Sequence, residues 1–191
     1  MKRKFFSLLV AFAMVFATAV PASATFIATP SSEAVCSYVS DVPENATLLD
    51  SQSFIFVSDD SGNITCYDAN SPIPFDSSVV WDGNNFRADI SFYQSGSTYY
   101  VKLYAYVTNT NYWFTNHTLN IRPKNNSDWF SHDYPHETKP KNITDTISFH
   151  YPNGAPDDVT VQVKGSITVD AEGLLAYEYG YFGSSTLDNP S

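Results

Sequence analysis

Apolar and polar residues alternate with a period of two along most of the chain beyond residue 24, as in β-strands that bury one face. The stretch 99–108, YYVKLYAYVT, shows the pattern most clearly. Its apolar face comprises Tyr99, Val101, Leu103, Ala105 and Val107. Helical periodicity is nearly absent beyond residue 24, and aromatic and β-branched residues, which favour strands, are abundant. We expect strands over 34–40, 53–58, 63–67, 86–94, 97–108, 118–122, 145–151, 159–170 and 174–182.

Many short strands separated by turn residues predict an all-β fold. The expected architecture is an antiparallel β-sandwich of two sheets, and a β-barrel is the alternative. Residues 25–191 have the length of a single domain that can bury a core. No internal repeat or low-complexity linker divides this region.

Turn sequences between the strands predict three hairpins and their registers. The first is a tight turn at Ser95-Gly96, and its register pairs Ile90 with Val101, Asp89 with Lys102 and Arg87 with Tyr104. The second is a three-residue loop at 171–173, and its register pairs Ile167 with Tyr177 and Gly165 with Tyr179. The third, at 60–62, places Phe56 opposite Cys66.

The first 24 residues have the organisation of a bacterial secretory signal peptide. Three basic residues at 2–4 precede an apolar run over 8–20, and Ala22-Ser23-Ala24 forms a small-residue cleavage site. The apolar run is short for a membrane span, and no later stretch approaches its length. We therefore expect a secreted protein with no membrane anchor after cleavage.

The charge of the chain is strongly negative. Its formal net charge is −10, and beyond residue 24 there are twenty acidic and only seven basic residues, a balance of −13. Such a surface repels nucleic acids and anionic membranes, so neither is an expected partner. The charge keeps an exported protein soluble, or it serves to bind cations or basic partners.

Cys36 and Cys66 are the only cysteines. In an exported chain, an even pair predicts a disulfide bond. Two buried thiols are the alternative.

The region 109–144, interrupted only by the strand expected over 118–122, reads as a long loop rich in aromatic residues, and such loops often carry function. Trp113, Trp129 and Tyr134 are the candidate ligand-binding residues within it, because flat aromatic rings stack on sugars. The polar face of 99–108 extends this candidate platform with Tyr100, Tyr104 and Tyr106. The alternative is that the loop rings anchor the loop to the sandwich and the tyrosines pack against neighbouring strands.

His132 and His136 are spaced by four residues, and Glu137 follows them. On a helix this spacing would place both imidazoles on one face for zinc, but Pro135 argues against a helix. We therefore expect no metal centre from the spacing alone, with His132, His136 and Glu137 as weak candidate ligands. His117 and His150 could join them only through the fold.

Calcium is the other metal to consider, because a secreted acidic sandwich can hold a structural ion. The turn sequences DDSGN at 59–63 and WDGN at 81–84 are acidic, but neither has the ligand spacing of an EF-hand loop. Ordinary turn chemistry accounts for both.

No catalytic motif stands out. The chain has no G-x-S-x-G, H-E-x-x-H or phosphate-binding loop. We expect no enzymatic activity and no cofactor, and a structural calcium ion is the alternative. The expected function is a non-catalytic binding module for a glycan or another cell-surface ligand. The alternatives are an extracellular protein-interaction or structural module, and a secreted hydrolase.

Overall fold

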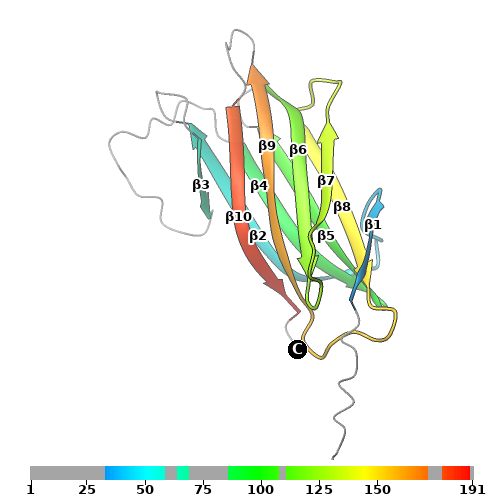
Figure 1. Cartoon of the computed structure of the whole chain (residues 1–191). Coiled ribbons are helices and arrows are strands. Elements are labelled where there is room, and N and C mark those ends of the chain that lie inside the picture. Colours follow the sequence, from blue (N-terminus) through cyan, green and yellow to red (C-terminus); the bar gives the residue numbers. More distant parts are fainter. Residues whose placement is uncertain (1–32, 59–63, 69–85, 108–110, 172–177, 190–191) are drawn as a thin grey trace, which may run out of the picture. The chain divides into compact units, whose positions relative to one another are not determined.

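The computed structural model describes residues 33–58, 64–68, 86–107, 111–171 and 178–189. Within them all regular secondary structure is β-strand (Figure 1). The ten strands are β1 (Val35–Val39), β2 (Thr47–Ser58), β3 (Ile64–Asp68), β4 (Phe86–Ser95), β5 (Thr98–Val107), β6 (Tyr112–Pro123), β7 (Phe130–Pro135), β8 (Asn142–His150), β9 (Thr160–Ala171) and β10 (Glu178–Asp188). None of the described residues form a helix long and apolar enough to cross a membrane. The predicted signal peptide, 1–24, lies outside the described residues.

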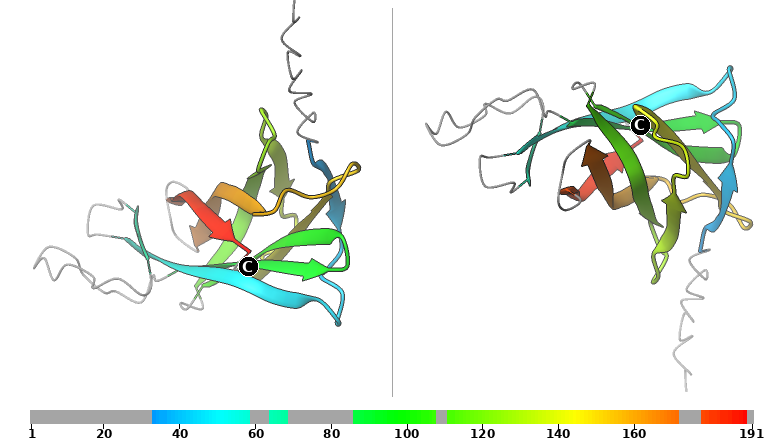
Figure 2. Two further views of the ribbon diagram at one scale, coloured as in Figure 1. Left: turned by 90° about the horizontal axis from the view of Figure 1, so that it is seen from below. Right: turned by 90° about the horizontal axis from the view of Figure 1, so that it is seen from above.

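The strands form two antiparallel sheets that pack face to face. The larger sheet has the order β1-β8-β5-β4-β2-β3, and the smaller has the order β10-β9-β6-β7. Figure 2 shows the two sheets as separate layers. Strand β10 packs against β2 and β3, whereas β6 packs against β5 and β8. The predicted sandwich is confirmed, and the sheets do not close into a barrel.

The core lies between the sheets and follows the predicted alternation. In β5, the inward-facing Val101, Leu103 and Ala105 are completely buried. Leu119 and Ile121 of β6 are equally buried in the opposite sheet. Burying each large apolar side chain contributes about 1.5–3 kcal/mol, so these facing stripes hold the two layers together.

The β4–β5 hairpin forms as predicted, but its turn and register are shifted. Ser95 pairs with Thr98, so the turn residues are Gly96 and Ser97 rather than Ser95 and Gly96. Gly96 has a φ of 59°, and a two-residue turn can place glycine at its first central position. The pairing moves by two residues, which leaves every side chain on its predicted face. Ala88 now faces Ala105, Asp89 faces Tyr104, Arg87 faces Tyr106, and Ile90 faces Leu103.

The other two hairpins have different outcomes. Phe56 pairs with Cys66, which confirms the register predicted for β2 and β3. In the β9–β10 pair, Ile167 faces Gly180 and Gly165 faces Phe182, so the register predicted there is wrong. The turn residues 60–62 and 172–177 lie outside the described residues.

The strand expected over 118–122 is confirmed as part of β6, but the loop expected over the rest of 109–144 is wrong, because strands occupy much of it as well. Strand β6 begins at Tyr112, and β7 occupies Phe130–Pro135. The register of β6 against β9 shifts between Phe114 and Asn116, which is a β-bulge. This bulge moves the buried positions from Phe114 to His117 and so interrupts the alternation on which the sequence prediction relied.

The predicted Cys36–Cys66 disulfide is not confirmed. Cys36 is a free, half-buried thiol in β1, and Cys66 belongs to β3. These strands form opposite edges of the larger sheet, five strand spacings apart. At about 4.8 Å per spacing they are separated by about 24 Å, whereas disulfide-bonded Cα atoms lie within about 7 Å of each other.

Candidate functional site

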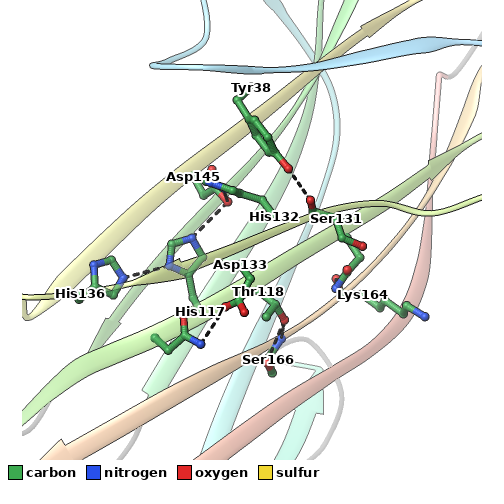
Figure 3. Close-up of polar contacts among 12 residues, drawn as sticks. Tyr38, His117, Thr118, Ser131, His132, Asp133, His136, Asp145, Lys164 and Ser166 are labelled. Atoms are coloured by element: carbon green, nitrogen blue, oxygen red, sulfur yellow. Dashed lines mark hydrogen bonds and ion pairs between the residues drawn. The ribbon is translucent and has the colours of Figure 1, made fainter.

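Three polar side chains occupy core-facing positions where the two sheets meet near β1 and β7. His117 comes from β6, His132 from β7 and Asp145 from β8 (Figure 3). Only 2% of His117 and 8% of Asp145 is exposed. Asp145 stands in an inward series between Ile143 and Ile147, so the strand itself directs its carboxylate into the sandwich.

One carboxylate oxygen connects the two imidazoles. Oδ2 of Asp145 lies 3.1 Å from Nε2 of His117 and 2.8 Å from Nδ1 of His132. The other ring nitrogen of His117, Nδ1, lies 2.9 Å from Nε2 of His136. The result is a hydrogen-bonded chain of four side chains, which we call the His–Asp cluster: His117, His132, His136 and Asp145.

The β-bulge in β6 helps to place His136. The backbone carbonyl of Thr115, at the bulge, accepts a hydrogen bond of 2.8 Å from the backbone N–H of His136. This bond holds the segment after β7 against β6. The imidazole of His136 therefore stacks on that of His117, with ring centroids 5.1 Å apart.

The cluster controls the charge of its members. Burial by itself would raise the pKa of Asp145, but hydrogen bonds from His117 and His132 outweigh burial and lower it. Burial lowers the pKa of His136, and the neighbouring His117 lowers it further. The cluster thus stabilises a carboxylate at its centre and a neutral imidazole at its end.

Two tyrosines flank the His–Asp cluster. The Tyr38 hydroxyl of β1 donates a hydrogen bond to the Ser131 carbonyl of β7, and its ring lies 4.0 Å from that of His132. This contact joins the edges of the two sheets. Tyr134 of β7 is 50% exposed, and its ring lies 5.8 Å from that of His117. Both side chains are partly exposed, 46% for Tyr38 and 50% for Tyr134, but Tyr38 is tied to the edge of the opposite sheet through its hydroxyl group.

The cluster lines a hollow of about 260 Å³. Its walls are Val39, Ser40, His117, His132, Tyr134, His136, Thr144, Asp145 and Thr146. A second hollow of about 420 Å³ shares Tyr134 and His136 with the first, and Glu137 lines it. Tyr134 thus stands where two hollows adjoin, with ionisable groups deeper inside.

The structure does not bring the six predicted ligand-binding residues together. Tyr100, Tyr104 and Tyr106 alternate with buried residues of β5 and lie on the outer face of the larger sheet. Trp129 contacts Arg122 and Lys164, 4.9 and 4.1 Å from its ring, on the smaller sheet. Only Tyr134 lines the hollow beside the cluster.

Trp113 has a similar cationic environment, at another place. The Lys139 and Lys141 ammonium groups lie 4.0 and 5.6 Å from its ring centroid. Four of the seven basic residues beyond residue 24 therefore lie over two tryptophans. These contacts favour an anchoring role for both rings.

Of the weak metal-ligand candidates, His132 and His136 belong to the cluster, whereas Glu137 is exposed outside it. His117 joins them through the fold, and His150 does not. Sequence reasoning missed Asp145. The available signal was an aspartate at an inward position of the series Ile143, Asp145, Ile147 and Phe149, where an apolar residue is expected.

Comparison with known proteins adds no relative. No family model matches the chain, and no curated protein sequence matches it.

Proposed function

We propose that this protein is a secreted glycan-binding module whose site is the pair of hollows around Tyr134. The observation that carries the proposal is the exposed Tyr134 ring beside the convergent polar groups of the His–Asp cluster. Sugars present flat C–H surfaces that stack on aromatic rings, and their hydroxyl groups need donors and acceptors nearby.

The size and composition of the hollows support this assignment. The volumes of about 260 and 420 Å³ adjoin at Tyr134 and His136. Ligand pockets in proteins have volumes of about 300–1,000 Å³. The walls carry imidazole, carboxylate and hydroxyl groups but few aliphatic side chains, which suits a polar ligand better than an apolar one.

The test is a depletion assay with insoluble polysaccharides and purified bacterial cell walls. Protein expressed from the full sequence is mixed with each polymer, and the protein left in the supernatant is measured. At least one polymer should deplete the protein, and Tyr134→Ala should abolish the depletion. Tyr104→Ala is the matched control, because Tyr104 is also exposed but lies on the outer face of the larger sheet.

The outcomes separate the alternatives. Depletion that survives Tyr134→Ala but is lost in Tyr104→Ala would assign binding to the outer tyrosine face instead. A protein that no polymer depletes would contradict glycan binding and favour the protein-interaction alternative.

A further inference from the structure

We infer that His117, His132 and Asp145 form a site for a divalent transition-metal ion, with zinc as the ion that fits best. This inference does not depend on glycan binding. It rests on the donor atoms, their spacing, the open side of the cluster and the contacts that orient the rings.

The donor atoms already converge on one point. One nitrogen of each imidazole and one carboxylate oxygen all lie within 4.8 Å of one another. Tetrahedral zinc with bonds of about 2.0–2.2 Å separates its ligand atoms by about 3.3 Å. The two contacts to Asp145 Oδ2, 3.1 and 2.8 Å, need to lengthen slightly, and the two imidazole nitrogens, which lie within 4.8 Å of each other, need to adjust to the same separation to admit the ion. The nitrogen that binds the ion must carry no hydrogen, so a neutral ring keeps its single proton on the other nitrogen, and only the second proton of a charged ring passes to solvent.

The kind of donor selects the kind of metal. Two imidazole nitrogens and one carboxylate oxygen suit zinc and its transition-metal neighbours. Calcium and magnesium prefer sites made wholly of oxygen, so they fit this set poorly. The cluster is therefore a different type of site from the calcium turns considered in the sequence.

The arrangement leaves room for a fourth ligand. Three protein ligands leave one tetrahedral position open, and all three line the hollow of about 260 Å³. A water molecule or a small ligand could complete the coordination from that side. This is the form of a zinc site that exchanges its ligand, in contrast to closed structural sites with four protein ligands.

Contacts outside the three ligands hold them in place. His136 Nε2 contacts His117 Nδ1, the ring nitrogen that faces away from Asp145. The Tyr38 ring packs 4.0 Å from the ring of His132, and its hydroxyl donates a hydrogen bond to the backbone carbonyl of Ser131. Such outer contacts fix ring orientation in metal sites, so His136 and Tyr38 are positioning residues here.

The experiment is a zinc titration of the full chain, in competition with a chromogenic zinc chelator. One zinc ion should bind per chain, and Asp145→Asn or His132→Ala should weaken binding by at least about 100-fold. His136→Ala should weaken it by about 10-fold, and His136→Gln should restore part of the loss. The matched controls are Asp133→Asn and His150→Ala. These remove an exposed carboxylate next to His132 and an exposed imidazole of β8, and both should leave binding unchanged.

Cobalt provides a second readout that does not depend on affinity. Co²⁺ in the wild-type chain should give the visible absorption of tetrahedral coordination, and zinc should displace it. His132→Ala is the variant least exposed to folding loss, because this side chain is 24% exposed. No zinc binding at micromolar metal would overturn the inference, and so would equal binding by folded His132→Ala and wild-type protein. Neither titration contains a glycan, so failure here is distinguishable from failure of the depletion assay.

Discussion

Nε2 of His117 lies 3.1 Å from Oδ2 of Asp145, and this contact connects the two sheets of the sandwich. His117 belongs to the smaller sheet and Asp145 to the larger one. Both side chains are buried at positions where the strand pattern would place apolar residues. A buried carboxylate is tolerated here because imidazole groups from two strands satisfy one of its oxygens.

Asp145→Asn should destabilise the protein by about 1.5–3 kcal/mol, because it removes a charged acceptor that two buried or half-buried imidazoles share. The measurement is urea-induced unfolding without added metal. Asp133→Asn is the control, since Asp133 is exposed and accepts one hydrogen bond of 2.8 Å from Asn116. Equal losses in the two variants would contradict a special role for the buried carboxylate.

Acidification should destabilise the fold in two steps. The pKa of His136 is lower in the folded state than the ordinary 6.5, so the stability that it contributes falls as the pH decreases below about 6.5. The pKa of Asp145 is lowered from 3.8, so its contribution is complete above about pH 4 and is lost as the pH falls through the folded pKa. His136→Gln should flatten the first step of the unfolding free energy against pH. A profile unchanged by this variant would argue against the lowered pKa.

Reducing agent should leave the melting temperature unchanged, because Cys36 and Cys66 belong to opposite edges of the larger sheet. Burial raises the pKa of the Cys36 thiol to about 11, so this thiol should react slowly with a thiol reagent near neutral pH. Denaturation should expose it to fast reaction. The comparison is the rate of thiol labelling in Cys66→Ser, folded and unfolded. A fall in the melting temperature of the wild type on reduction would show that the two cysteines do form a disulfide.

Gly96→Ala should cost about 1–2 kcal/mol, because the φ of 59° at the β4–β5 turn disfavours any residue with a Cβ atom. No atom lies within 4 Å of an added Cβ, so the cost comes from the backbone alone. Gly96→Asn should lose less, since asparagine tolerates left-handed conformations better. Thermal unfolding distinguishes the two variants, and equal stability of Gly96→Ala and wild type would refute the turn geometry.

Trp129→Ala should lower stability by about 1–2 kcal/mol, because Arg122 and Lys164 both lie over the ring and each such contact contributes about 0.5–1 kcal/mol. Trp129→Phe should retain part of this stabilisation. Polymer depletion should be the same for all three proteins. If Trp129→Ala lost depletion while its stability stayed unchanged, Trp129 would be a ligand-binding residue, as the sequence suggested.

The sequence predicted the site only in part, and the reason lies in the bulge at Phe114–Asn116. The aromatic and proline-rich character of 109–144 suggested a loop on both sides of the strand at 118–122. The bulge interrupts the alternation that would have extended this strand back to Tyr112. Within that region His132 and His136 were recognised as possible ligands, but their partner Asp145 was taken as an ordinary strand residue. The sequence shows that Asp145 is charged, but it does not show that β6 and β7 bring His117 and His132 to face it.

By itself, the sequence determined the fold class, most of the strands and the face that each buries. Alternation is a local property, so β5 could be assigned its buried face from residues 99–108 alone. Only the tertiary structure decided which strands are neighbours. That choice joins His117, His132 and Asp145 from three strands of two sheets, and it places the two cysteines on opposite edges. Strand order depends on contacts between residues far apart in the chain, and the local alternation of apolar and polar residues does not determine these contacts.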